Sequence, residues 1–211
     1  MRNYQANLLD PTQCAVVIID HQPQMYFAIE GKTRSCIANN VVALAKASQL
    51  FQVPCVLTTV EAKTFSGNMY SKLAQVNPKT VPIDRTCINA WEDANLKKAV
   101  EATGRKKIIL SGLWTEACVA FPALCMLAEG YEIYVATDAC GGASKEAHDM
   151  AVMRMTQAGV KPVTSLQVML EWQRDWANKA TYQGVMTIAK EHAGVYGLGI
   201  EYGETMVQGQ A

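Results

Sequence analysis

Short apolar runs alternate with longer amphipathic segments along most of this chain, and the alternation predicts an α/β protein. Apolar, β-branched runs typical of strands cover residues 14–19, 54–60, 80–83, 107–111, 131–137 and 160–164, with the run at 80–83 the weakest. Helical spacing and helix-stop residues predict helices over 35–51, 68–75, 92–103, a segment ending near 129, 144–158 and 165–175. Strands separated by helices imply βαβ units, a parallel sheet and helices on both of its faces.

The alternation stops near residue 180, so we expect one domain over residues 1–180 and a C-terminal tail over 181–211. The tail is rich in glycine and has few long apolar runs, which favours a segment that packs on a neighbouring subunit or lies loose. Gly197-Leu198-Gly199 lacks the third glycine and the preceding strand of a dinucleotide-binding loop, so we do not interpret it as a cofactor site.

Composition removes several classes of function. The 211 residues are half apolar and carry 19 basic and 19 acidic side chains, so there is no charge excess to bind nucleic acid or an anionic membrane. No apolar stretch is long enough to span a bilayer, and the amino terminus lacks the apolar core of a signal peptide. We therefore expect a cytoplasmic protein.

The seven cysteines include no Cys-x-x-Cys pair, which favours reduced thiols that mostly pack as small apolar side chains. Cys118 differs because it follows the strand at 107–111 and Gly112, near the expected start of a helix. Backbone N–H groups at a helix amino terminus favour thiolate over thiol. Pro122 limits this argument, because a regular helix is expected to begin near Phe121, which leaves Cys118 on the turn before it.

Asp20 ends the first predicted strand. In a doubly wound sheet, ligands bind at the carboxyl ends of the two strands that flank the reversal of strand order. If the strands at 14–19 and 107–111 are those neighbours, the Asp20 carboxylate and the Cys118 thiol share one crevice. A plain strand-ending turn residue is the alternative interpretation of Asp20.

Four stretches, at 17–22, 85–91, 111–124 and 136–139, occur in the order found in one known family. Through them the chain resembles the isochorismatase-like cysteine hydrolases, and within these the YcaC-type branch, from about residue 8 to 178. The segment Gly112-Leu113-Trp114-Thr115-Glu116-Ala117-Cys118-Val119 is the most specific. The resemblance implies a three-layer α/β/α sandwich with a six-stranded, mainly parallel sheet of order 3-2-1-4-5-6.

The resemblance also implies a catalytic triad of Asp20, Arg85 and Cys118. Most relatives have lysine at the position of Arg85. Arginine stays protonated, so Arg85 is expected to fix Asp20 and favour the thiolate without shuttling a proton. A surface arginine in a short loop is the alternative. The backbone N–H groups of Trp114 and Cys118 would form the oxyanion hole, after a cis peptide between Leu113 and Trp114.

The matching loops supply candidate pocket residues, namely Gln22, Asn89, Trp91 and Phe121. For Trp91 and Phe121, an ordinary place in the core is an equal alternative. We expect no metal and no cofactor. The nicotinamidases of this superfamily carry an Asp-x-His pattern, and the stretch 61–68 here contains no histidine. His21 follows Asp20 and is expected to point away from the carboxylate and to be structural.

The predicted function is cofactor-free hydrolysis of a small amide-like substrate through a thioester on Cys118. Two alternatives stay open: a hydrolase that cleaves a vinyl ether without a cysteine nucleophile, and a non-catalytic thiol module for redox sensing or binding. The expected partners are a small-molecule substrate and further copies of the chain. The resemblance implies an octamer.

Overall fold

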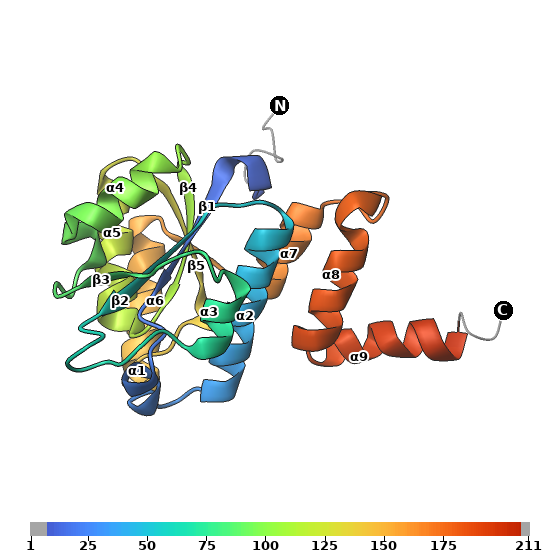
Figure 1. Cartoon of the computed structure of the whole chain (residues 1–211), viewed down its shortest axis with the longest axis horizontal. Helices are drawn as coiled ribbons and strands as arrows, with labels where there is room; N and C mark the ends of the chain where they lie inside the picture. Colours follow the sequence, from blue (N-terminus) through green and yellow to red (C-terminus); the bar gives the residue numbers. More distant parts are fainter. Residues whose placement is uncertain (1–7, 208–211) are drawn as a thin grey trace.

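The computed structural model describes residues 8–207, and within them it forms a six-stranded, all-parallel sheet of order β3-β2-β1-β4-β5-β6 (Figure 1). The strands are β1 (Cys14–Ile19), β2 (Cys55–Val60), β3 (Ile83–Arg85), β4 (Lys107–Gly112), β5 (Glu132–Ala136) and β6 (Lys161–Val163). The helices are α1 (Pro23–Phe27), α2 (Arg34–Leu50), α3 (Ser71–Val76), α4 (Ala94–Ala102), α5 (Ala120–Ala128), α6 (Lys145–Ala158), α7 (Ser165–Gln173), α8 (Lys179–His192) and α9 (Val195–Tyr202). The predicted three-layer fold and strand order are confirmed.

Two apolar cores lie on opposite faces of the sheet, because successive side chains of a strand point to opposite sides. In β1, Val16 and Ile18 face the core that α2, α3, α7 and α8 cover. Val17 and Ile19 face the core under α4, α5 and α6. Figure 1 shows these two groups of helices on either side of the sheet. All six residues of β1 are buried, which explains why its sequence is a continuous apolar run.

The strand with the weakest sequence signal has bounds that differ from the predicted ones. The apolar pattern placed it at 80–83, whereas β3 begins at Ile83 and ends at Arg85. Its pairing with β2 aligns Thr58 with Ile83 and Val60 with Arg85. The pairing with a neighbouring strand, and not local apolar content, selects these three residues. The shift matters because it makes Arg85 the last residue of a strand at the edge where ligands bind.

β1 and β4 are neighbours at the reversal of strand order, as predicted. Their register aligns Ile18 with Ser111 and Ile19 with Gly112. A Cβ at Gly112 would lie 2.8 Å from the Ile19 carbonyl oxygen, so only glycine allows this close approach. The N–H of Leu113 then donates to that oxygen at 3.1 Å. The chain segments that follow β1 and β4 therefore leave the sheet side by side.

The segment expected to be a loose or intersubunit tail is helical in its described part. The expected boundary at residue 180 falls within α8, whose apolar face joins the core beside α2. A Cβ at Gly184 would lie 2.5 Å from a methyl carbon of Leu50, so this glycine serves close helix packing. α9 then leads away from the body of the molecule (Figure 1). Residues 1–7 and 208–211 of the expected domain and tail lie outside the described residues.

Among the helices within residues 8–207, none has the length and apolar character that a membrane span needs. The cysteines form no disulfide in this part of the chain, as the sequence predicts.

Candidate active site

Asp20 and Arg85 form an ion pair that is hidden from solvent. Nη2 of Arg85 donates to Oδ2 of Asp20 at 2.7 Å, and both side chains are 0% exposed. Nη1 of Arg85 donates to the carbonyl oxygen of Cys87 at 2.7 Å, which fixes the guanidinium in its plane. The interpretation of Arg85 as a surface loop residue is therefore wrong. It lies at the end of β3, across β2 from the end of β1.

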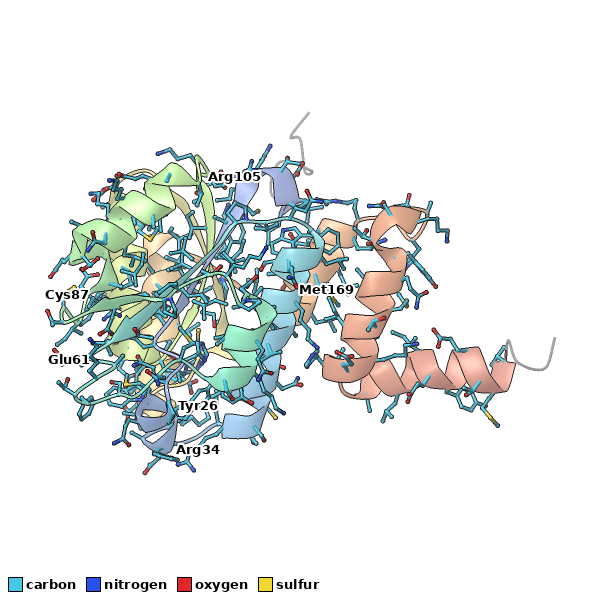
Figure 2. The ribbon with its side chains drawn as sticks, in the orientation of Figure 1. Tyr26, Arg34, Glu61, Cys87, Arg105 and Met169 are labelled. Atoms are coloured by element: carbon cyan, nitrogen blue, oxygen red, sulfur yellow. The ribbon has the colours of Figure 1, made fainter. Side chains whose placement is uncertain are left out.

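The side-chain view shows where this edge lies in the molecule. Figure 2 labels Glu61 and Cys87, which flank the Arg85 backbone, and Tyr26 of α1, all along the lower left of the view. Arg105, which precedes β4, is labelled at the opposite, upper end. The candidate site thus occupies the carboxyl edge of the sheet.

Cys118 lies on a wide turn that leads into α5. Residues Thr115–Val119 form one turn of π-helix, and α5 begins at Ala120. Pro122 is the third residue of α5 and so lies in its first turn, where proline is best tolerated. The prediction that the regular helix begins after Cys118 is confirmed. Cys118 is 5% exposed and packs with the core under α5.

The thiol of Cys118 contacts the Asp20 carboxyl, and burial dominates the protonation of both groups. Burial raises the pKa of Asp20 to about 6, against the opposing effect of Arg85. Burial and the neighbouring Asp20 raise the pKa of Cys118 to about 12, against Arg85 and the Trp114 backbone N–H. At neutral pH the pair is therefore a carboxylate beside a neutral thiol.

This protonation state limits the sequence argument that backbone N–H groups and Arg85 favour the thiolate. α5 begins two residues after Cys118, and the loss of water around the sulfur outweighs the favourable dipoles. Oδ1 of Asp20 is buried and has no hydrogen-bond partner in the described part of the chain. It is the oxygen available to accept a proton from the thiol.

The backbone N–H of Trp114 lies in the candidate site, and its ring packs against α1. The peptide between Leu113 and Trp114 is cis, as the resemblance implied. The N–H of Trp114 points toward the Cys118 sulfur and lowers the thiol pKa. The indole Nε1 donates to the carbonyl oxygen of Met25 at 2.9 Å, which holds the ring against α1.

Gln22 is buried, and its polar atoms are engaged by the loop after β2. Its Nε2 donates to the carbonyl oxygens of Val60 at 3.1 Å and Gly67 at 2.6 Å, and its Oε1 accepts from the N–H of Val60 at 2.9 Å. Gln22 therefore holds the loop after β2 in place through hydrogen bonds of its side-chain amide. Its amide nitrogen and oxygen are both engaged in this way and do not face a substrate as free groups.

Asn89 and Trp91 have structural partners as well. Oδ1 of Asn89 accepts from the Trp91 N–H at 3.1 Å and caps the short turn Ala90–Glu92. The Trp91 indole is buried, donates to Glu129 at 2.9 Å and packs edge-on against Tyr131. Trp91 is therefore a core residue, which was the alternative to its assignment to the substrate pocket. Phe121, in contrast, is exposed.

The segments that leave the carboxyl edge of the sheet carry exposed apolar side chains. They lie on the segments that follow the first four strands in chain order, namely Phe27, Phe65, Ile88 and Phe121. We call this set the apolar rim. The carboxyl ends of parallel strands meet at one edge of the sheet, so the rim marks the approach to Asp20 and Cys118.

Three residues next to Cys118 were not assigned to the site from the sequence. Thr115 and Glu116 are part of the turn that carries Cys118, and His148 lies on α6 and contacts that turn. Oγ1 of Thr115 and Nδ1 of His148 are 2.7 Å apart. Thr115 and Glu116 were visible only as part of the family-like segment. His148 carried no local signal, because its partner is 33 residues away.

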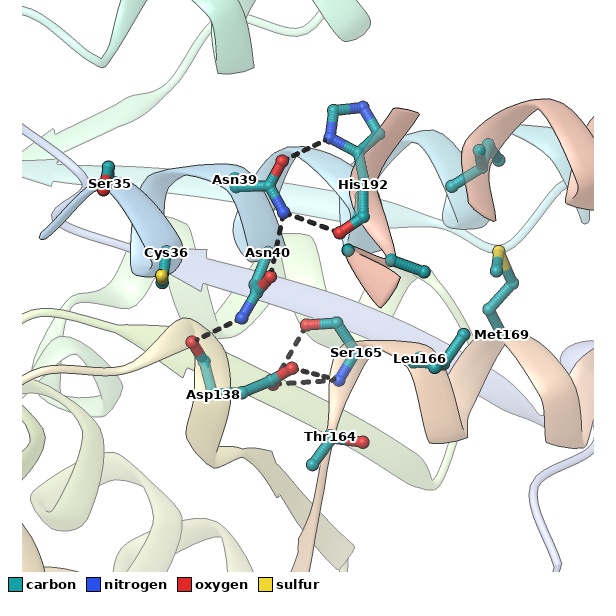
Figure 3. A pocket seen from close by; sticks show the side chains of 14 residues that line it. Ser35, Cys36, Asn39, Asn40, Asp138, Thr164, Ser165, Leu166, Met169 and His192 are labelled. Atoms are coloured by element: carbon teal, nitrogen blue, oxygen red, sulfur yellow. Dashed lines mark hydrogen bonds between the residues drawn. The ribbon is translucent and has the colours of Figure 1, made fainter. Parts of the chain in front are cut away.

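A separate open cavity of about 710 Å³ lies between α2, α7 and α8 (Figure 3). Asp138, from the family-like stretch at 136–139, accepts there from the N–H and the hydroxyl of Ser165 and thereby caps α7. None of Asp20, Arg85 and Cys118 lines this cavity. Among residues 8–207, no group of three His, Cys, Asp or Glu side chains could hold a metal ion.

The comparisons with known proteins define the class of protein. The isochorismatase domain matches residues 14–167, so the chain belongs to the isochorismatase family. Among its relatives is the probable hydrolase YcaC of Escherichia coli, with 36% identity over 185 residues, 87% of this chain and 88% of the relative.

Several solved structures share this fold. YcaC from Pseudomonas aeruginosa, with hexane-2,5-diol and covalent acrylamide, superposes with a TM-score of 0.90 at 34% identity, covering 97% of this chain and all of the other. Escherichia coli YcaC, described as an octameric hydrolase of unknown specificity, gives 0.91 at 34% identity, covering 98% of this chain and all of the other. Bacillus subtilis nicotinamidase PncA shares the fold at 16% identity, with a TM-score of 0.62, covering 72% of this chain and 99% of the other.

Proposed function

We propose that this protein hydrolyses a C–N bond in a small amide-like substrate, with Cys118 as the nucleophile. One observation carries the proposal. A carboxylate held by a buried arginine lies against a neutral thiol, and its free oxygen Oδ1 has no other partner. This is the arrangement of a base beside a nucleophile that is activated only when the substrate arrives.

In the first step, the Cys118 proton passes to Oδ1 of Asp20 while the sulfur forms a bond to the amide carbon. The electrons of the carbonyl double bond move to its oxygen. The backbone N–H groups of Trp114 and Cys118 donate to that oxyanion. The Trp114 N–H already points toward the sulfur, which supports its part in this step.

In the second step, the tetrahedral intermediate collapses and the C–N bond breaks. The leaving nitrogen takes the proton from Asp20, which returns to carboxylate, and an S-acyl cysteine remains. Asp20 then accepts a proton from water as the water oxygen attacks the thioester. The second tetrahedral intermediate collapses with cleavage of its C–S bond, the carboxylic acid product departs, and the Cys118 sulfur recovers a proton from Asp20. No cofactor takes part in this sequence.

Arg85 acts on Asp20 without moving a proton. Its positive charge opposes the effect of burial on the Asp20 pKa and so keeps the carboxylate available above pH of about 6. Its second hydrogen bond, to the Cys87 carbonyl, holds the guanidinium in place. Arg85 is thus an electrostatic and orienting partner of the base.

Two observations bear on the ligand. The solved YcaC from Pseudomonas aeruginosa holds a covalent acrylamide, which is a small amide and an electrophile. The apolar rim of this chain favours a substrate with an apolar group next to the amide. A redox sensor needs an accessible thiol of low pKa, whereas Cys118 is buried and its pKa is raised.

The test is a panel of small amides, hydroxamates and one vinyl ether, assayed for ammonia or hydroxylamine release, vinyl-ether cleavage and acyl-enzyme mass. We expect Cys118-dependent release from an amide, and loss of it by at least about a thousandfold in Cys118→Ala. Cys36→Ala, an exposed cysteine on α2, is the matched control. Vinyl-ether turnover that survives Cys118→Ala would reject the proposal.

We also propose that the chain forms a homo-oligomer in which α9 is covered by another copy. Val195, Leu198, Tyr202 and Met206 recur at helical spacing on α9 and the turn after it, and all four are exposed. A contiguous apolar stripe of this kind marks an association surface. The octameric Escherichia coli YcaC aligns with 98% of this chain, which supports a second copy as the partner.

Light scattering measures this directly. The wild type is expected to have the mass of several chains, and Leu198→Lys with Tyr202→Lys is expected to lower that mass. Leu8→Lys, another exposed apolar residue but distant in sequence from the stripe, is the control. A monomeric wild type would contradict the proposed assembly.

A further inference from the structure

The turn that carries Cys118 has an uncommon geometry that needs support. Within Thr115–Val119 the hydrogen bonds follow the π-helical pattern, and the N–H of Val119 donates to the Trp114 carbonyl at 3.3 Å. Single π-turns are rare and occur mostly at functional sites. A turn of this kind keeps one geometry only where contacts with the rest of the protein select it. Two such contacts hold its first residues.

The first contact joins Thr115 to α6 and to the loop before it. The Thr115 N–H donates to the Gly141 carbonyl at 3.0 Å, and its hydroxyl lies 2.7 Å from Nδ1 of His148. Both side chains are buried. Burial lowers the pKa of His148 to about 4, so the imidazole is neutral at pH 7. A neutral ring can accept the Thr115 O–H at Nδ1, which satisfies both groups.

The second contact joins Glu116 to the same loop. Its Oε1 accepts from the Ala143 N–H at 2.9 Å, and its Oε2 is buried with no hydrogen-bond partner within residues 8–207. Gly142 lies between the two contacts. A Cβ there would be 2.6 Å from Oε2 of Glu116 and 3.0 Å from the backbone nitrogen of His148. Gly142 therefore packs closely against both Glu116 and the His148 turn of α6.

We propose that Thr115, Glu116 and His148 are positioning residues that hold the Cys118 turn so that its thiol meets the free carboxyl oxygen of Asp20. The inference rests on the proposed chemistry of Cys118 and deepens it. None of the three needs to touch a reacting atom. Their contacts fix the backbone two and three residues before the sulfur, where a small displacement separates the thiol from its base.

The test measures the rate at which acrylamide alkylates Cys118, followed by mass spectrometry over a range of acrylamide concentrations. Thr115→Val removes the hydroxyl with little change in shape. We expect the maximal labelling rate to fall by about ten- to a hundredfold, with little change in the concentration that gives half of it. Thr115→Ser restores the hydroxyl and is expected to restore most of the rate.

One further variant disturbs the same contact, and a second one serves as the matched control. Gly142→Ala forces Glu116 or the His148 backbone to move and is expected to slow labelling by a similar factor. Thr156→Val makes the same chemical change as Thr115→Val, but on α6, where the Thr156 hydroxyl bonds only its own helix at Val152. It is the matched control and should label like the wild type.

Amide hydrogen exchange over residues 114–120 separates this inference from the proposed function. Faster exchange in Thr115→Val, reversed in Thr115→Ser, supports the positioning role even if the wild-type thiol proves unreactive, an outcome that would count only against the proposed chemistry. Unchanged exchange in Thr115→Val overturns the inference. So does faster exchange with wild-type labelling, because the contact would then stabilise the turn without positioning the nucleophile.

Discussion

The carboxyl edge of the sheet and the C-terminal arm, residues 179–207, use similar interactions in opposite surroundings. At the edge, Arg85 and Asp20 meet at 2.7 Å with no exposed side-chain surface. On the arm, Lys190 and Glu204 meet at 2.8 Å with 25% and 42% of their side chains exposed. Distance alone therefore says little about what an ion pair does. Burial makes the first pair control protonation, and water screens the second.

Glycines in the two regions also differ from what their sequence context suggests. Gly112 at the site and Gly184 on the arm both allow a close approach: Gly112 to the Ile19 carbonyl at the β1–β4 junction, and Gly184 to the Leu50 side chain of α2. The glycines between residues 194 and 209, together with few long apolar runs, suggested a tail that packs on a neighbouring subunit or lies loose. The structure shows that Gly184 is a packing position. A glycine in a helix indicates close contact where an opposing side chain fills the space, as Leu50 does here.

The largest expected effect is at Asp20. Asp20→Asn removes the proposed base, and the maximal rate of Cys118 labelling should fall by about a hundredfold or more. In the wild type, the rate should rise as pH increases through about 6, because only the carboxylate accepts the thiol proton and burial raises the Asp20 pKa to about 6. The variant should lose this rise. A pH profile identical to the wild type would show that another group is the base.

The next effect is at Arg85. Arg85→Met leaves a buried carboxylate without its cation, and removing one partner of such a pair costs about 3–5 kcal/mol of unfolding free energy. Because Arg85 lowers the Asp20 pKa, its loss should also move the acid limb of the labelling profile to higher pH. Urea unfolding measures the loss of stability, and the pH profile of Cys118 labelling measures the shift of the acid limb.

Arg85→Lys is the matched control for that change. It keeps the positive charge and should keep the acid limb close to that of the wild type, with a smaller loss of stability. A limb that stays at its wild-type position in Arg85→Met would contradict the electrostatic role of Arg85.

A smaller effect is expected on the arm. Gly184→Ala places a methyl group 2.5 Å from Leu50, and overpacking of this kind costs about 1–3 kcal/mol of unfolding free energy. Gly199→Ala, on α9 with nothing within 4 Å, should instead stabilise by about 0.5–1 kcal/mol. Both should label Cys118 at the wild-type rate. Equal stability of the two variants would show that the α8–α2 contact is loose.

The smallest effect is expected at an exposed ion pair. Lys46 of α2 meets Glu191 of α8, with 33% and 49% of their side chains exposed. Lys46→Ala should change the unfolding free energy by at most about 1 kcal/mol, and by less in high salt. A loss comparable to that in Arg85→Met would remove the distinction between the buried and the exposed pair.

The sequence by itself determined most of the sheet and singled out Cys118 as the candidate nucleophile. The apolar runs of β1, β4 and β5 are local properties of the chain, and the context of Cys118 stood out because a strand, a glycine and a helix follow one another there. The end of the first predicted strand supplied Asp20 as a candidate, and the resemblance supplied Arg85. Neither local pattern nor resemblance stated the charge on the thiol, because this depends on how much water the fold removes.

Only the tertiary structure decided what surrounds these residues. Arg85 became buried because pairing of β3 with β2 placed it at the sheet edge, 65 positions along the chain from Asp20. His148 met Thr115, and Leu50 met Gly184, through packing between segments that are distant in sequence. Burial also decided the charge on Cys118, whose thiol stays protonated at neutral pH because its pKa is raised to about 12. Protonation follows the local dielectric, and only the assembled fold determines it.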